Sequence, residues 1–315
     1  MADPSMISWL TYGWEASYAT VTSTADKVFG EGQKISNLTR RNNIEKVFAC
    51  GSRNAQKQVA KAYEGSISVE SNLANPWFFR ALLGAHTTTG AGPYTHTFSE
   101  ADEIESISIF NNVQSDTASV SKLLGCKIAT CTLNNSVGEL TRVKLDMAYA
   151  NETLTSTTTS KVSESFDLYT FAQATLELPT SSTLALIQNC ELTIANNPEM
   201  LWGLGSRFGQ AQPVKQREYS CRIGQAFQSS SDLLTKLYGA STGANSTVSE
   251  AATLKFTYTN GLTSTNARSI TLTFTGVQID EESMPQDPTQ AIIEDVTLTM
   301  RSLSCVAIDN TSTIP

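Results

Sequence analysis

The sequence predicts a mainly β protein made of two tandem β-sandwich or barrel domains, each with one short packed helix. Composition is the first reason, because charged residues make up only 17% of the 315 residues, against roughly a quarter in typical soluble domains. Ser, Thr and Asn are abundant, and many segments are rich in the β-branched and aromatic residues that favour strands. The other two reasons are an internal repeat and a strand pattern that recurs within it.

The internal repeat appears when the 33 residues from Asn37 are set under the 33 residues from Glu191. The two stretches align without a gap, and 13 of these 33 positions are identical. The shared positions include two triplets, Gly51-Ser52-Arg53 and Gly205-Ser206-Arg207. Two further landmarks follow in the same order, with NPWFFRALLGA matching SSDLLTKLYGA and SISIFNNVQSD matching SITLTFTGVQID. Collinear matches of this kind indicate a repeated structural unit.

The boundary between the two units is expected in the polar stretch TLTSTTTSKVSES, since Ser/Thr-rich runs are typical of linkers. We therefore predict a first domain at residues 1–160 and a second at 161–315.

Each copy is expected to hold the same elements in the same order. A strand leads into a Gly-containing loop around the triplet, a second strand follows, and a short amphipathic helix comes next. The helix lies between a cap at Asn75 and a stop at Gly84 in the first copy, and between Asp232 and Gly239 in the second. The remaining strands are expected at 106–109, 127–133 and 140–149, and at 253–258, 269–277 and 292–302.

The strand that follows the first triplet alternates in character. Tyr63, Ile67 and Val69 fall on one face and are expected in the core. The opposite face, with its equivalents in the second copy, carries Glu64, Ser66, Ser68, Glu70, Glu218 and Ser220. We expect this second face to be polar and acidic.

At this point the residues resemble a known family. The run FDLYTFAQATLELPTSSTLALIQNCELTIANNPEMLWGLGSRF, the strands after it and the ending DVTLTMRSL are similar to the tail tube proteins of siphovirus-type phages and related archaeal tailed viruses. The first copy carries a weaker form of the signature, together with GCKIATCTLNNSVGELTRVKLDMAYA. The resemblance implies that one curved sheet from each domain joins its neighbours into a barrel around a lumen, and that rings stack into a tube.

The resemblance also implies partners and a location. The partners would be further copies of the chain, a tape measure protein, tail terminator and tail-tip proteins, and double-stranded DNA that passes transiently. The location would be the virion tail, after assembly in the host cytoplasm.

If the chain forms such a tube, the polar residues from Glu64 to Glu70, with Glu218 and Ser220, are candidates to face the lumen, where acidic groups would repel phosphates. An ordinary solvated outer face is the competing interpretation. The two Gly-Ser-Arg triplets are candidates for an inter-domain or inter-ring loop.

The duplication predicts that three chains supply the six domains of a ring. Residues 1–164 hold 16 acidic and 14 basic side chains, a net charge of −2, and residues 165–315 hold 14 and 8, a net charge of −6. This asymmetry would favour alternation of the two copies around the ring. A ring of six two-domain chains is the rival arrangement.

Other classes of protein fit less well. A net charge of −8 argues against a protein that grips nucleic acid phosphates. The chain has no apolar run of membrane-spanning length, and its N-terminus does not read as a signal peptide, so no membrane association is expected. The six cysteines lack CxxC spacing and are expected to be reduced, buried thiols.

No catalytic, metal or cofactor site is expected. Residues 239–243 match the GxSxG nucleophile elbow, but His86 and His96 both precede it, which is the wrong order for that fold. Those histidines lie in a segment that looks mobile and has no third ligand nearby. Asp280-Glu281-Glu282 reads as a run of solvated loop carboxylates. A tail terminator, a head-decoration protein and a β-sandwich adhesin remain as alternatives.

Overall fold

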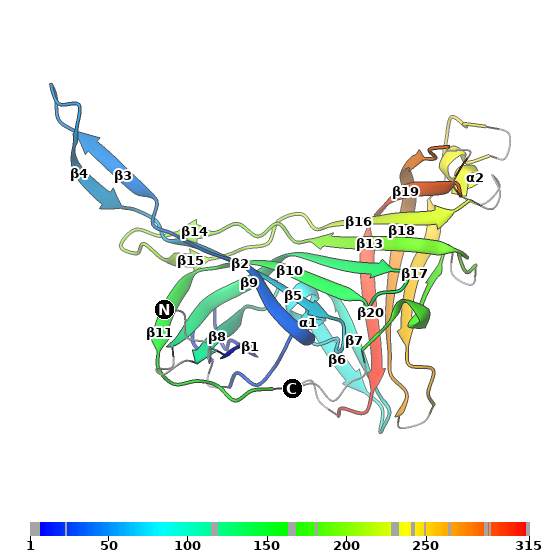
Figure 1. Cartoon of the computed structure of the whole chain (residues 1–315), viewed down its shortest axis with the longest axis horizontal. Coiled ribbons are helices and arrows are strands. Elements are labelled where there is room, and N and C mark those ends of the chain that lie inside the picture. The colour runs from blue at the N-terminus through cyan, green and yellow to red at the C-terminus, as the bar shows by residue number, and fades with distance from the viewer. Residues whose placement is uncertain are drawn as a thin grey trace.

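A computed structural model describes residues 7–22, 24–114, 119–162, 168–179, 182–227, 233–240, 243–248, 250–263, 266–286, 289 and 291–312. The chain is mainly β and antiparallel, with two short α-helices (Figure 1). The predicted fold class is confirmed.

We call the elements from β1 to β11 the first unit. They are β1 (Ile7–Trp14), β2 (Glu31–Arg41), β3 (Ile44–Phe48), β4 (Ala55–Ala60), β5 (Glu64–Asn72), α1 (Phe78–Leu83), β6 (Gly84–Thr89), β7 (Tyr94–Glu100), β8 (Ile107–Gln114), β9 (Ser119–Ser136), β10 (Arg142–Tyr149) and β11 (Asn151–Thr155).

The elements from η1 to β20 form the second unit. They are the 3-10 turn η1 (Phe171–Gln173), β12 (Ala174–Glu177), β13 (Ile187–Ala195), β14 (Leu201–Trp202), β15 (Gly209–Ala211), β16 (Glu218–Ala226), α2 (Leu233–Tyr238), β17 (Ala251–Thr259), β18 (Ser269–Ser283), β19 (Ile293–Met300) and β20 (Ser302–Asp309).

One long sheet runs through both units in the order β2-β5-β10-β9-β13-β16-β19-β18. Each unit also has an outer sheet, β1-β8-β9-β11 in the first and β12-β17-β18-β20 in the second. The pairing pattern of β1, β2, β5, β8, β9, β10 and β11 is therefore repeated by β12, β13, β16, β17, β18, β19 and β20. In each unit the long sheet packs on the outer sheet as a sandwich.

Strands β9 and β18 take part in two sheets each because they bend midway. The bends lie at Gly125 and Gly276, which have φ values of 67° and 62°. This left-handed region strongly favours glycine. A Cβ at Gly276 would also lie 2.2 Å from Nε of Arg301. The two glycines thus allow one strand to pass from the outer sheet into the long sheet in each unit.

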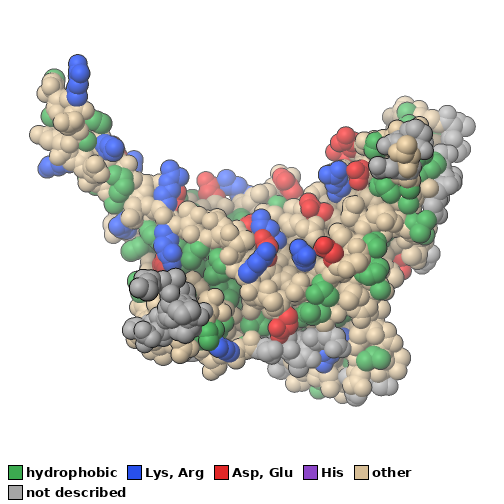
Figure 2. Space-filling view, viewed as in Figure 1, with side chains coloured by type: hydrophobic (Ala, Val, Ile, Leu, Met, Phe, Trp, Pro, Cys, Tyr) green, Lys and Arg blue, Asp and Glu red, His purple; other side chains and the backbone are tan. Residues whose placement is uncertain are grey.

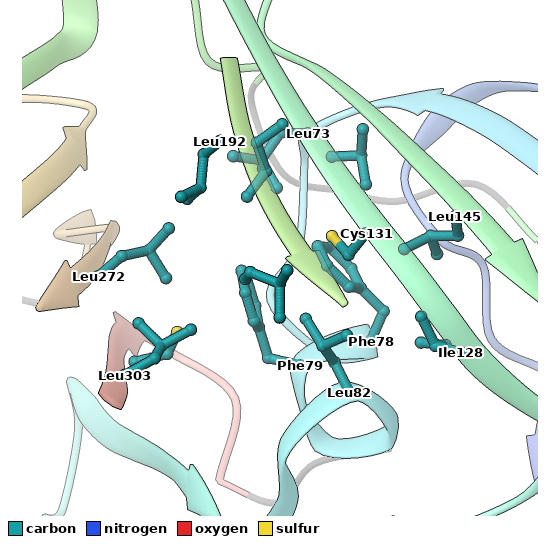
Figure 3. Close-up of a cluster of buried hydrophobic side chains, with 14 of the residues drawn as sticks. Leu73, Phe78, Phe79, Leu82, Ile128, Cys131, Leu145, Leu192, Leu272 and Leu303 are labelled. Atoms are coloured by element: carbon teal, nitrogen blue, oxygen red, sulfur yellow. The ribbon is translucent and has the colours of Figure 1, made fainter. Parts of the chain in front are cut away.

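The hydrophobic core is continuous through both units. Phe79 and Leu82 of α1 lie between Leu145 of the first unit and Leu272 and Leu303 of the second (Figure 3). The two units are thus packed as one body.

Helix α1 ends as predicted, at Gly84 with a φ of 100°. Its N-cap is Trp77 and not the predicted Asn75. Asn75 lies before the helix, where its Oδ1 accepts a hydrogen bond of 3.2 Å from the backbone N–H of Trp77. Helix α2 also ends before its predicted glycine, Gly239. The expected start of α2 at Asp232 lies outside the described residues.

Three predictions about local structure need correction. The triplet segments are not plain loops but the tips of β-hairpins, β3–β4 and β14–β15. The segment with the two histidines is the ordered hairpin β6–β7. Residues 292–302 form two strands, β19 and β20, which separate at Arg301.

The third landmark of the repeat is also wrong as a structural match. It equates the start of β8 with the start of β18, whereas β8 holds the place of β17 and β18 holds the place of β9. Both stretches alternate apolar and polar residues because both are half-buried strands, and that pattern does not identify which strand is which.

All six cysteines are unbonded in the structure, in agreement with the expected free thiols. Five are buried, but Cys50 lies exposed in the turn between β3 and β4. Cys190 and Cys221 lie on paired strands with their sulfur atoms 3.5 Å apart.

Candidate functional site

The polar face of the long sheet is the first candidate site. Along β5 every second residue is buried, so that Ile67 and Val69 point into the core while Glu64, Ser66, Ser68 and Glu70 point away from it. Strand β16 repeats this alternation, with Glu218 and Ser220 exposed. The six polar residues selected from the sequence therefore share the face opposite the core.

The charge of that face differs from the sequence prediction. Acidic residues do not dominate it throughout, because basic residues lie beside them on neighbouring strands. On the first unit the face carries four acidic and four basic residues in register, namely Glu31, Glu64, Glu70 and Asp146, and Lys34, Arg41, Arg142 and Lys144. On the second unit it carries four acidic residues and one basic residue, namely Glu191, Glu218, Glu281 and Asp295, and Arg222.

The acidic groups of the first unit are largely compensated. Lys34 Nζ lies 2.7 Å from a carboxylate oxygen of Glu70, and Lys144 Nζ lies 3.3 Å from Asp146. The hydrogen bond from Lys34 holds the pKa of Glu70 below its ordinary value. An acidic surface is therefore confined to the second unit. The sequence prediction did not take account of the basic residues on β2 and β10. The face on which these side chains lie depends on the register of β2 and β10 with β5.

The hairpin β3–β4, which we call the first arm, is the second candidate site. It projects away from the body of the molecule at the upper left of Figure 1. Ile44, Val47, Phe48 and Val59 on it are each between 46% and 56% exposed. Gly51, Ser52 and Arg53 lie at its exposed tip, where a Cβ on Gly51 would meet nothing within 4 Å.

The first arm is also basic. It carries Lys46, Arg53 and Lys57, and Lys61 follows at its base. Its one acidic residue, Glu45, forms an ion pair of 2.9 Å with Lys61. Figure 2 shows the basic side chains on this projection. Apolar and basic side chains that no described residue covers mark a surface suited to an acidic partner.

The hairpin β14–β15, the second arm, lies against the first unit instead. The carbonyl of Arg207 accepts a hydrogen bond of 2.8 Å from the backbone N–H of Tyr63, and the Arg207 guanidinium donates to Asn42 at 2.5 Å. The Phe208 ring meets the Tyr63 ring edge-on, with centroids 5.9 Å apart. The second triplet, Gly205, Ser206 and Arg207, thus lies at a contact between the two units.

The contact between units has two further parts, and we call the whole the intrachain junction. Strand β9 of the first unit pairs with β13 of the second, which makes the long sheet continuous. Hairpin β6–β7 of the first unit adds to β20 at the edge of the second outer sheet. There His96, fully buried, lies 2.9 Å from Thr88 Oγ1 and 3.2 Å from Asp309 Oδ1. The addition of this hairpin to the sheet of the other unit was not predicted from the sequence.

The ends of the long sheet are the third candidate site. Among the described residues, β2 pairs within the sheet with β5 alone, and residues 278–283 of β18 pair with β19 alone. Unpaired strand edges of this kind are templates for pairing with another chain.

Within the described part of the chain, no group of three His, Cys, Asp or Glu side chains is arranged to hold a metal ion. No α-helix there has the length and hydrophobicity that a membrane crossing requires. The serine of the GxSxG match, Ser241, lies outside the described residues.

Comparison with known protein families gives a match to the chain. The family model described as "Phage tail tube protein" matches residues 9–306, which is nearly the whole sequence. No curated protein matches the sequence.

Proposed function

Because the chain belongs to the phage tail tube protein family, we propose that it is the major tail tube subunit of a long-tailed, siphovirus-type virus and that three chains form each ring of the tube. Each chain supplies two tandem tube domains, residues 1–160 and 161–315, so that three chains give a ring with pseudo-sixfold symmetry.

The observation that carries this proposal is the long sheet. Each unit contributes four strands to it in the same order, the junction between units is strand pairing, and both ends are open within the described chain. Repetition of the same step by further copies closes the sheet into a barrel, and closure removes exposed edges. The repeated pairing pattern and the repeated bends at Gly125 and Gly276 support a tandem duplication.

The polar face of the long sheet would then line the lumen. Its side chains are short or ionic, and acidic and basic groups are paired on the first unit, so the wall offers few free cations to phosphates. The acidic face of the second unit adds repulsion toward DNA. Such a wall suits a conduit through which a tape measure protein and then the genome pass without sticking.

Stacked rings need a start and an end, so tail-tip and tail terminator proteins are the expected partners at the two ends of the tube. An assembly of this kind forms in the host cytoplasm and resides in the virion tail.

Electron microscopy of the purified chain tests the proposal. Tubes whose cross-sections contain three chains with six similar domains are the expected result. Discrete rings that never stack would instead indicate a tail terminator. Dispersed monomers over a wide range of concentration would refute a tube subunit.

A further inference from the structure

The intrachain junction provides a template for the contact between chains. In it, Thr130 of β9 lies opposite Ala195 of β13, Cys131 opposite Ile194, and Thr132 opposite Thr193. The pairing continues one residue further, where the backbone N–H of Asn196 donates to the carbonyl of Ala129 at 2.8 Å. Ala129 is the extra residue of a bulge between β9 and β10.

The open edge of β18 repeats the β9 side of this junction. Strand β18 has a bulge against β19 at Asp280, between Ile279 and Glu281. Glu281, Glu282 and Ser283 therefore hold the places of Thr130, Cys131 and Thr132. Glu282 lies opposite the buried Val296, so its side chain is on the core side of the sheet, while Glu281 is on the polar face.

The open edge of β2 repeats the β13 side. Arg41 lies opposite Glu64 on β5, as Ala195 lies opposite Glu218 on β16. Arg41, Arg40 and Thr39 therefore hold the places of Ala195, Ile194 and Thr193. Applied to these edges, the register of the intrachain junction sets Glu281 opposite Arg41, Glu282 opposite Arg40, and Ser283 opposite Thr39.

The charges of the two edges are complementary in this register, although the residues in the same places at the intrachain junction carry no charge. Three acidic residues, Asp280, Glu281 and Glu282, are consecutive on one edge. A hollow at the other edge, at the base of the first arm, is lined by Arg40, Arg41 and Lys61 among others. Strand pairing in this register would bring the acidic bulge to the basic hollow.

The side chains of the two edges also have unused bonding capacity. Oε2 of Glu282 is buried and has no hydrogen-bond partner among the described residues. Burial raises the pKa of this carboxyl group. A carboxylate oxygen that is buried without a hydrogen-bond partner carries an energetic cost, and a cation from another chain would lower that cost.

On the other edge, Arg40 donates from Nε and Nη2 to Glu152, each at 2.6 Å, which leaves Nη1 without a bond to any described residue. Within the described residues, the side chain of Arg41 makes no hydrogen bond or ion pair. Both guanidinium groups can therefore accept a further carboxylate, which suits the fork geometry of arginine.

We propose that the β18 edge of one copy of this chain pairs with the β2 edge of the next in the register of the intrachain junction, with Glu281 and Glu282 bound to Arg41 and Arg40. This proposal rests on the ring proposed above and specifies its contact between chains. The same geometry lays the basic first arm over the acidic second unit of the adjacent copy, as the second arm lies over the first unit. The ionic contacts select the correct end, because two β18 edges or two β2 edges would oppose like charges.

A disulfide experiment tests the register. In a Cys50→Ser background, which removes the exposed thiol, Thr39→Cys and Ser283→Cys place thiols directly opposite each other on the polar face. The matched control combines Ser283→Cys with Asn37→Cys, which is displaced by two residues along β2 on the same face and leaves both ionic contacts in place. That displacement separates the Cα atoms by about 7 Å or more, beyond ordinary disulfide reach.

After mild oxidation of assembled protein, the first pair is expected to give covalent multimers that end at the number of chains in a ring, at least about tenfold more than the control gives. If microscopy shows rings but the control cross-links as much as the first pair or more, the proposed register is wrong, while the proposed ring is still supported. Absence of both rings and cross-links would overturn the ring and this contact together.

Charge reversal tests the ionic selection without disturbing Arg40 and its bonds to Glu152. Arg41→Glu is expected to raise the protein concentration needed for assembly about tenfold or more, and Arg41→Glu with Glu281→Arg in the same chain to restore it to within about threefold. Melting curves of both variants confirm that they fold. Loss of assembly in the double variant equal to that in the single variant would contradict the proposed pairing.

Discussion

The intrachain junction and the two open ends of the long sheet are built from the same parts but differ in chemistry. Inside the chain, Thr130, Cys131, Ile194 and Ala195 meet without charges. At the open ends the corresponding places carry two glutamates and two arginines. Two units that are covalently joined meet at high effective concentration and need no further selection. In the proposed ring, two separate chains would have to find the correct edge, and complementary charges would provide that selectivity.

The junction also has a support that the open ends lack. Hairpin β6–β7 crosses from the first unit to β20, where the carboxylate of Glu100 accepts hydrogen bonds from the Tyr219 hydroxyl and, at 2.6 Å, from the backbone N–H of Leu303. The described residues of the second unit contain no such hairpin. In the proposed ring, the units would thus be joined more firmly than one chain is to the next, which would let a monomer fold before it assembles.

The largest effect is expected when the two units are separated, which tests whether the first unit depends on the intrachain junction to fold. Residues 1–160 expressed alone would lose the partners of β9 and β7 and the part of the core that Leu192, Leu272 and Leu303 supply. We expect this fragment to show no cooperative thermal transition by circular dichroism, and co-expression with 161–315 to restore one. A sharp transition of the fragment alone would show that the units are independent.

The next largest effect is expected at a pair of equivalent asparagines. Asn196 is fully buried at the junction, where its amide donates to the carbonyls of Leu82 and Ile128 and its Oδ1 accepts from Arg217. Asn42 holds the same place in the first unit and is exposed. Asn196→Ala should lower the free energy of unfolding by about 3 kcal/mol, because it leaves buried polar groups without partners.

The matched variant Asn42→Ala should lower the free energy of unfolding of the monomer by less than about 0.5 kcal/mol. Urea denaturation of the two variants under conditions that prevent assembly measures the difference. Equal losses would mean that the open end is already as ordered as the junction.

A mixture of two charge variants tests whether a ring contains three chains or six. Arg41→Glu alone and Glu281→Arg alone each create like-charged contacts at every interface, but the two variants complement each other when they alternate around a ring. Alternation is possible with six chains and impossible with three, where one like-charged contact always remains. We therefore expect the mixture to recover assembly only in part, by light scattering, whereas the single chain with both changes recovers it fully. Full recovery by the mixture would favour six chains.

The smallest effect concerns Arg40 and Glu152, whose places in the second unit are taken by Ile194 and Leu303. Burial raises the pKa of Glu152, but hydrogen bonds from Arg40, Ser121 and Tyr63 outweigh it and hold that pKa below the ordinary value. A lowered pKa in the folded state stabilises the protein above the unfolded pKa of about 4.3, and this contribution disappears as the pH falls through the folded pKa.

Glu152→Gln should therefore remove part of the loss of stability between about pH 5 and pH 3, at a cost of about 1 kcal/mol at pH 7. Chemical denaturation of the monomer at several pH values checks this. An unchanged pH profile would show that Glu152 does not contribute to acid sensitivity.

Several features were determined by the sequence itself, because they depend on neighbouring residues alone. The alternation from Glu64 to Glu70 specified which side chains face the core, since successive residues of a strand point to opposite faces. Gly84 ended α1 because its φ of 100° lies in the left-handed region that favours glycine. The repeated triplets marked equivalent positions in the two units.

The tertiary structure decided what depends on partners distant in the chain. Asn42 and Asn196 are the same residue in the same local sequence, yet one is exposed and the other fully buried, because only the second has β9 beside it. The acidic run at Asp280 looked like a solvated loop until the bulge of β18 placed it on an open edge of the sheet. The periodicity of a strand determines the direction of its side chains, but the strand that pairs with it follows from packing over the whole chain.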